Sequence, residues 1–175
     1  MPQHFHAEQW LPYPVELVFA FFANPENLPR LMPAWQKVRI EEAMFQAPPP
    51  RPEGTPRFPG AVAGSGSRIL ISARIAPWLP PRAGWDARIE DFRWNEGFCD
   101  VQYTGPFKSW RHCHTVTARD NDKGMPGTLV TDEVTYEPPF GELGVLAAKP
   151  ALHYAWRIRH ERTAALLARA TTNAR

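Results

Sequence analysis

Ionisable side chains recur at alternate positions between residues 98 and 136, among apolar neighbours. Because residues two apart in a strand point to the same face, Asp100 shares a face with Gln102, and His112 with His114. Polar groups inside a protein need partners, so we interpret this face as the wall of a cavity. Its expected polar members are Asp100, Gln102, His112, His114, Asp132 and Tyr136.

The chemistry of this wall depends on how the strands pair. A hairpin turn centred near Phe107 places Asp100 opposite His114 and Gln102 opposite His112. The register is a hypothesis, because a slip of one residue moves the whole set to the other face of the sheet.

A second turn, centred near Lys123, places His114 opposite Asp132. An imidazole between two carboxylates has a raised pKa and favours the imidazolium form, which suits a general acid. The same residues also fit a hydrogen-bonded ladder that fixes strand register without catalysis. The catalytic candidates are therefore named without being assigned: Asp100, His112, His114 and Asp132.

Two His-x-His pairs have a spacing that can bind zinc. Each pair, His4 with His6 and His112 with His114, lies on one side of an expected strand. A zinc site needs three or four placed ligands, and nothing else in the sequence demands a metal, so we expect no metal and no cofactor. His4 and His6 are expected to be partly exposed.

Aromatic residues are the second component of the expected cavity. Seven tryptophans in one chain indicate a large apolar interior or an apolar ligand site. Most of them are expected to be core, and the rest to line the cavity. The expected ligand-contacting set is Trp85, Asp100, Gln102, Trp110, His112, His114, Asp132, Tyr136 and Trp156.

Covalent catalysis is not expected. No serine, cysteine or aspartate stands in a nucleophile motif, and the sequence from Gly64 to Ser67 lacks the lysine and helix of a phosphate loop. Cys99 and Cys113 are too few for a disulfide framework. We expect both to be reduced thiols on the face opposite the histidines.

Composition limits the function classes. The 175 residues fit a single domain, residues 1–175, and 20 basic against 18 acidic residues give a net charge of +2. Bulk electrostatic binding of nucleic acid is therefore not expected. No apolar run approaches the ~20 residues that span a bilayer, so we expect no stable membrane insertion. The first residues do not resemble a signal peptide, and a cytoplasmic location is the default expectation.

Apolar spacing and turn residues predict the order of elements. The sequence favours one strand, two short helices, six further strands and a long amphipathic C-terminal helix. The expected ranges are strand 4–10, helices starting at residues 15 and 25, strands 36–42, 67–75, 84–94, 98–104, 109–118 and 128–137, and helix 141–170.

Two connections are unusual. Residues 43–66 contain a proline-rich tract that can form neither a helix nor a central strand. A loop of this length can be a gate, a partner surface or a tolerated insertion. Residues 77–81 are apolar where a loop is normally polar, and could cover the mouth of a cavity.

Three stretches carry a resemblance to a known family. They are Pro14-x4-Phe19-x2-Phe22-x-Asn24-Pro25-x-Asn27-Leu28 with Pro33, Phe98-x-Asp100-x-Gln102-x2-Gly105-Pro106-Phe107-x2-Trp110-x-His112-x-His114, and Asp132-x-Val134-x-Tyr136-x2-Pro139-Phe140-Gly141. With the order of elements, they resemble the START-like (SRPBCC) superfamily, and within it the bacterial polyketide cyclase/dehydrase-like proteins.

The resemblance implies an α+β helix-grip (START/Bet v 1-like) fold. In that fold a curved antiparallel sheet of about seven strands wraps around a long C-terminal helix, with two short helices after the first strand. A cavity between sheet and helix then holds a lipid, quinone, polyketide or aromatic compound. The loop at 43–66 departs from the compact pattern of the family.

Three functions remain open at this point. The first is non-catalytic binding of a hydrophobic or amphipathic small molecule. The second is a cofactor-independent cyclase or dehydratase that uses His112 or His114 as acid or base. The third is an interaction module that binds a protein partner through the proline-rich loop.

Overall fold

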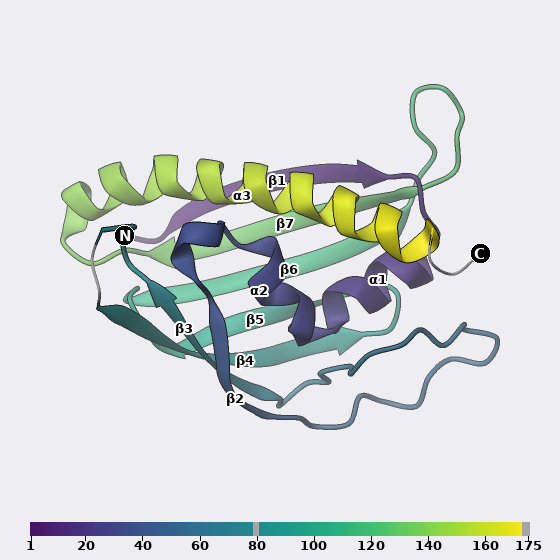
Figure 1. The fold of residues 1–175 in the computed structure, drawn as a ribbon, viewed down its shortest axis with the longest axis horizontal. Helices are drawn as coiled ribbons and strands as arrows, with labels where there is room; N and C mark the ends of the chain where they lie inside the picture. The colour runs from purple at the N-terminus through teal and green to yellow at the C-terminus, as the bar shows by residue number, and fades with distance from the viewer. Residues whose placement is uncertain (79–80, 173–175) are drawn as a thin grey trace.

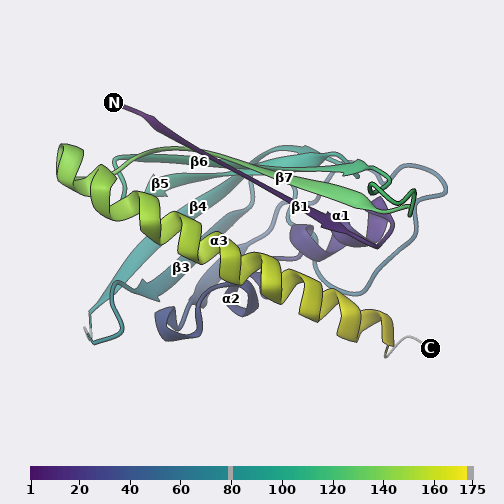
Figure 2. The ribbon, with the colours of Figure 1, turned by 90° about the horizontal axis from the view of Figure 1, so that it is seen from above.

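The computed structural model describes residues 1–78 and 81–172. One seven-stranded antiparallel sheet has the strand order β1-β7-β6-β5-β4-β3-β2, and a long helix crosses one face of it (Figures 1 and 2). The expected helix-grip architecture is confirmed. The elements are β1 (Gln3–Leu11), α1 (Val15–Ala23), η1 (Pro25–Asn27), α2 (Leu28–Leu31), η2 (Ala34–Gln36), β2 (Arg39–Met44), β3 (Arg68–Arg74), β4 (Arg82–Arg93), β5 (Gly97–Thr104), β6 (Ser109–Ala118), β7 (Thr128–Glu137) and α3 (Gly141–Thr172).

The two short helical segments follow from local sequence signals. Helix α1 buries Val18 and Phe19, and ends where Asn24 adopts an extended conformation before Pro25. The Asn24 side chain accepts a hydrogen bond from the Glu26 N–H, 3.1 Å away, which caps the next turn. This cap lets the chain change direction and place α2 beside α3.

Helix α3 carries a single inward stripe. Its buried residues recur at spacings of three and four, as one face of an α-helix requires; they are Leu152, Trp156, Arg159, Thr163 and Leu167. Pro150 lies within the helix and is exposed. None of the described helices is both long and apolar enough to cross a bilayer.

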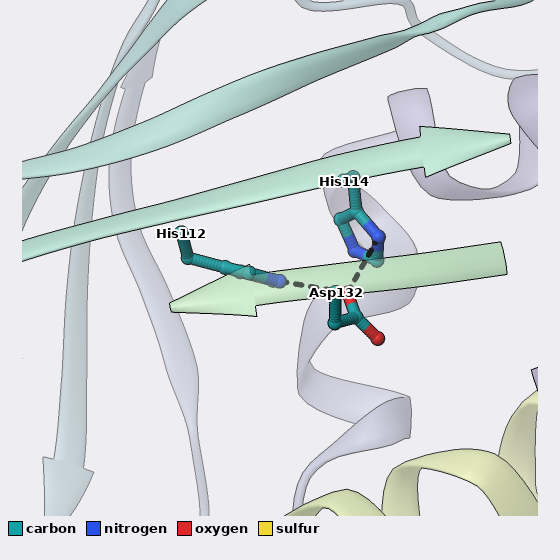
Figure 3. Close-up of side chains that lie close together, drawn as sticks. All are labelled: His112, His114 and Asp132. Atoms are coloured by element: carbon teal, nitrogen blue, oxygen red, sulfur yellow. Dashed lines mark hydrogen bonds and ion pairs between the residues drawn. The ribbon is translucent and has the colours of Figure 1, made fainter. Parts of the chain in front are cut away.

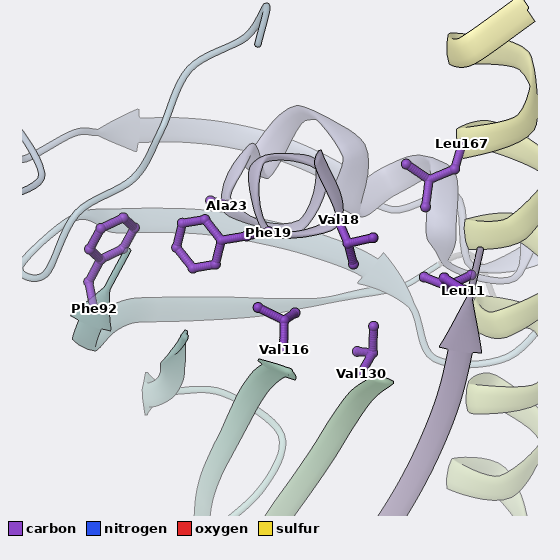
Figure 4. Packing of buried hydrophobic residues seen from close by; sticks show 8 residues of the cluster. All are labelled: Leu11, Val18, Phe19, Ala23, Phe92, Val116, Val130 and Leu167. Carbon is purple, nitrogen blue, oxygen red and sulfur yellow. The ribbon is translucent and has the colours of Figure 1, made fainter. Parts of the chain in front are cut away.

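The main apolar core lies at the end of the sheet near α1 (Figure 4). Phe19 and Val18 of α1 point toward the sheet and are at most 1 % exposed, and Leu167 of α3 closes the cluster from the other side. Complete burial of such side chains contributes about 1.5–3 kcal/mol each. The cluster therefore holds α1, the sheet and the C-terminal part of α3 together.

The β5–β6 register differs from the expected one. Asp100 pairs with His112, and His114 pairs with Phe98 rather than with Asp100. The turn is reached one residue earlier than expected. The reason is the Gln102 side chain, whose Nε2 donates to the Phe107 carbonyl at 2.7 Å and whose Oε1 accepts from the Phe107 N–H at 3.3 Å.

The β6–β7 register is the expected one, with His114 opposite Asp132. A shift of two residues in β5–β6 leaves every side chain on its original face, so the polar set still shares one side of the sheet. Gly97, which pairs with Thr115, permits the close approach of β5 and β6, because a Cβ at this position would collide with the His114 carbonyl.

The expectation of reduced thiols was wrong. Cys99 and Cys113 lie directly opposite each other in β5 and β6 and form a disulfide. Their side chains do lie on the face opposite His112 and His114, as expected from the alternation. The number of cysteines does not decide whether they pair, whereas their placement directly across a hairpin brings the two sulfurs within bonding reach.

The connection between β2 and β3 has no regular structure, in agreement with its proline content (Figure 1). It is tied to the body where the Trp94 indole N–H donates to the Pro49 carbonyl at 2.8 Å and Arg51 stacks on the Trp94 ring. In the apolar link at 77–81, Trp78 is 80 % exposed. Leu79 and Pro80 lie outside the described residues, so covering of a cavity mouth by this link remains a prediction.

Candidate functional site

His112 stands between two carboxylates on the inner face of the sheet. Its Nδ1 lies 2.7 Å from Oδ2 of Asp100, and its Nε2 lies 2.7 Å from Oδ1 of Asp132. The ring is thus fixed from β5 on one side and from β7 on the other. The sequence placed His114 between these carboxylates, and the shifted β5–β6 register gives that position to His112.

Asp132 is the centre of the network, and Figure 3 shows both imidazoles turned toward it. It is 1 % exposed. Its Oδ2 accepts the indole N–H of Trp156 at 2.9 Å, and His114 Nδ1 lies 2.8 Å from Oδ1, at an angle poor for a linear hydrogen bond. The Trp110 indole donates to Asp100 at 3.3 Å. Each carboxylate therefore has several donors, which offsets the cost of its burial.

The pKa of His112 is raised to about 9. Burial alone would lower this pKa, but the charge of Asp100 and the hydrogen bonds to Asp100 and Asp132 outweigh it. The same contacts hold the pKa of Asp132 well below its usual range despite burial. At neutral pH this part of the network is an imidazolium between two carboxylates.

The pKa of His114 shifts in the opposite direction, to about 4. Burial is the main cause, and the nearby charges of Arg159 and His112 act in the same direction against the pull of Asp132. Arg159 Nη2 is hydrogen-bonded to His114 Nε2, so Nε2 accepts and the ring proton belongs on Nδ1, facing Asp132. His114 is therefore neutral at neutral pH.

A cavity of about 440 Å³ lies between the sheet and α3, beside this network. This volume is in the range of small-molecule sites. Its wall is mainly apolar, from β3, β4 and the short helices. Its polar members include the His112 network and four residues on other elements: Asn24, Asn27, Gln36 and Arg74. Six of the nine expected ligand-contacting residues line it: Trp85, Asp100, Trp110, His112, His114 and Trp156.

The other three expected residues are placed elsewhere. Gln102 holds the β5–β6 turn, and Tyr136 packs in the core against Phe107 and Trp110. Asp132 lies behind the two histidines and orients them. The sequence correctly placed all three on the inner face, but not all of that face borders the cavity.

The sequence analysis did not predict several lining residues, two of them outside the sheet. Arg159 of α3 and Phe22 of α1 line the cavity, as does Phe98 of β5. A signal for Arg159 was present, because it follows Trp156 by three residues on the buried stripe of α3 and is the one charged member of that stripe.

A hollow of about 580 Å³ on the opposite side of the sheet is not a comparable site. It is shallow and lined by residues such as Arg88, Glu90 and Tyr103. Glu90 is already paired with Arg111 at 2.8 Å, and Arg88 stacks on Tyr103. Its charged groups partner one another rather than converge on a ligand.

His112, His114 and Asp132 offer ligand atoms within 4.8 Å of one another, the distance range of a metal site. Their chemistry does not fit a cation. The raised pKa of His112 keeps that ring protonated, whereas a metal ligand must be deprotonated. The guanidinium of Arg159 also occupies the Nε2 side of His114. His4 and His6, the second pair, are exposed on β1.

Comparison with known proteins gives a family match over most of the chain. The model of the family described as "Polyketide cyclase / dehydrase and lipid transport" matches residues 11–155. No curated protein sequence matches.

Solved structures share the fold at low sequence identity. A START superfamily protein from Mycobacterium smegmatis superposes with a TM-score of 0.57 at 14% identity, covering 93% of this chain and 98% of its own. A protein from Nitrosomonas europaea gives a TM-score of 0.62 at 13% identity, with 97% and 96% covered. One from Thermus thermophilus gives 0.56 at 17%, with 94% and 99% covered.

Proposed function

This chain belongs to the polyketide cyclase/dehydrase and lipid-transport family, and from that premise we propose that it binds one hydrophobic or amphipathic small molecule between its sheet and α3. The family and fold support a ligand-binding or polyketide cyclase-like role. The observation that carries the choice of binding is the cavity of about 440 Å³, whose lining is mainly apolar with a minority of polar side chains. Affinity then comes from apolar burial, and specificity from the few polar groups.

The cyclase or dehydratase alternative has one observation in its favour. Two neighbouring imidazoles whose pKa values shift in opposite directions, His112 to about 9 and His114 to about 4, form the kind of pair that serves as acid and base. Yet every ring nitrogen already has a close neighbour in the protein: Asp100 and Asp132 for His112, Asp132 and Arg159 for His114. Proton transfer to a ligand would first break one of these contacts, which favours binding.

The third hypothesis, a protein partner at the proline-rich loop, gains no support from the family match or the solved neighbours. The loop's best-defined contacts are with its own body, at Trp94. Binding inside the cavity is the function we retain.

Titration with dodecan-1-ol, followed by tryptophan fluorescence, tests the proposal. Three cavity-lining tryptophans, Trp85, Trp110 and Trp156, report on occupation of the site. We expect a saturable change that corresponds to one alcohol per chain. The absence of any saturable change would count against the proposal.

A matched pair of variants locates the binding. Ala87 is 4 % exposed and lines the cavity, so Ala87→Phe fills part of its volume and should weaken binding at least roughly tenfold. Ala118→Phe adds the same ring at an exposed position outside the lining and should bind like the parent. Equal binding by both variants would place the alcohol elsewhere.

A further inference from the structure

Arg159 is a charged residue at the wall of an apolar cavity. It lies on the inward stripe of α3, is 8 % exposed, and lines the cavity beside Phe22 and Trp156. Its guanidinium carbon lies 5.6 Å and 5.8 Å from the centres of those two rings. A buried arginine of this kind is normally held by a carboxylate.

Within the described part of the chain, no such carboxylate is in hydrogen-bond or ion-pair contact with Arg159. Among residues 1–78 and 81–172, its one hydrogen bond joins Nη2 to the neutral ring of His114, while Nε is buried without a partner. The oxygens of Asp132 are taken by His112, His114 and Trp156. Those of Asp100 are hydrogen-bonded by His112 and Trp110. The cation therefore keeps unused donors beside the cavity.

Resting on the binding function proposed above, we propose that Arg159 binds the carboxylate of an amphipathic acid whose apolar part fills the cavity. A guanidinium matches a planar carboxylate with parallel N–H···O hydrogen bonds. The apolar part has room against the β3 and β4 residues Ile69, Ile71 and Ala87, which line the same cavity.

The charges around Arg159 are compatible with an anion. Asp100 and Asp132 balance His112 and Arg159, and His114 is neutral, so the network has no net charge. Coulomb attraction falls with distance, and an anion in contact with Arg159 interacts most strongly with that residue. Asp100 is hydrogen-bonded by His112 and Trp110, and Asp132 by His112 and Trp156. Neither aspartate makes a hydrogen bond or ion pair with the guanidinium.

The test compares two ligands with one tail. Dodecanoate and dodecan-1-ol are titrated into the full chain at neutral pH by calorimetry. We expect dodecanoate to bind about tenfold more tightly or better, since charged hydrogen bonds are stronger than neutral ones. Arg159→Gln should abolish this preference while the affinity for dodecan-1-ol stays within about twofold. Arg159→Lys keeps the charge without the planar fork and should retain part of the preference.

Arg157→Gln is the matched control, because Arg157 is an exposed arginine of the same helix that is not part of the cavity wall. It removes the same charge and should leave the preference unchanged. If Arg159→Gln does not fold, the comparison of the two ligands on the parent chain and on Arg159→Lys still decides the question.

The outcomes separate this inference from the function on which it rests. If the alcohol binds and the acid binds no more tightly, the carboxylate site is wrong and the binding function stands. Loss of the preference in Arg157→Gln, or its survival in Arg159→Gln, also overturns the assignment to Arg159. If neither ligand binds, the proposed function itself fails.

Discussion

Asp132 holds more of the site together than any other residue described. Three side chains, His112, His114 and Trp156, meet its two oxygens within 2.9 Å, although the carboxylate itself is out of reach of a ligand. Its role is to fix the two imidazoles and to keep His112 charged. A buried polar network can specify structure, and here it also shapes one wall of the cavity.

Removing this carboxylate should be costly. Asp132→Ala leaves the buried imidazolium of His112 with one partner and the Trp156 indole N–H with none, so we expect a loss of about 3–5 kcal/mol in the free energy of unfolding. Urea denaturation measures it.

Glu133→Ala is the control for that experiment, because Glu133 is the next residue of β7 and pairs with His6 on the exposed face. Its expected cost is within about 1 kcal/mol. Similar losses for the two variants would contradict the central role of Asp132.

The two histidines predict how stability depends on pH. The pKa of His112 is about 9 in the folded chain against 6.5 as an ordinary value, so its contribution is complete below pH 6.5 and is lost as the pH rises toward 9. The pKa of His114 is about 4, so the unfolded chain takes up a proton first and stability falls as the pH drops from 6.5 toward 4. Stability should therefore peak near pH 6.5.

Urea unfolding across that pH range measures the profile. His112→Asn should lower stability overall and also reduce the loss of stability between pH 6.5 and 9. His6→Asn, at an exposed position, should keep most of that pH-dependent loss. A parent chain whose stability is constant from pH 6.5 to 9 would show that His112 is not held as an imidazolium.

At the scale of the residue, alternation along the strands predicted which side chains share the inner face, and the structure brings six of nine to the cavity. It could not predict which histidine lies between the aspartates. That depends on the position of one turn, which the Gln102 side chain sets through its two hydrogen bonds to Phe107. Strand alternation carries no information about α3 and so does not predict Arg159, although the spacing of Arg159 from Trp156 is visible in the sequence.

The β5–β6 hairpin is the element on which the site depends. It supplies Asp100, His112 and His114, and its outer face carries the Cys99–Cys113 disulfide. The disulfide thus joins the two strands directly behind the histidines. The number of cysteines gave no hint of it, because pairing depends on register.

Loss of this disulfide should lower stability. The two cysteines are 14 residues apart, and closing a loop of about this length stabilises a protein by roughly 3 kcal/mol in the chain-entropy account. We expect the unfolding temperature to fall when reductant is added. The double variant Cys99→Ala/Cys113→Ala should unfold at the same temperature as the reduced parent chain, with or without reductant.

Alkylation of the unfolded, unreduced chain checks the same point chemically. Protection of both cysteines is the expected result. If both cysteines are alkylated and reductant does not change the unfolding temperature, the cysteines are reduced thiols, as the composition predicted.

At the scale of the whole molecule, the order of the helices and strands was predictable from the sequence, whereas the size of the cavity was not. Turn residues and apolar spacing identified the strands and the helices to within a few residues. Boundaries shifted where local geometry intervened, as at Lys37, whose left-handed backbone (φ 44°) ends η2 and delays β2 to Arg39. The cavity depends on how far α3 lies from the sheet, which is decided by the packing of two clusters of buried side chains that include Leu152 and Leu167 of the helix.

The cavity is the feature on which the functional account depends, and native mass spectrometry tests it most directly. The chain is measured as purified, and again after incubation with excess dodecan-1-ol, beside Ala87→Phe. We predict one small apolar molecule per parent chain in at least the second measurement, and little or none on Ala87→Phe. If the parent chain shows only the mass of the protein without a ligand in both measurements, the proposed binding function is contradicted.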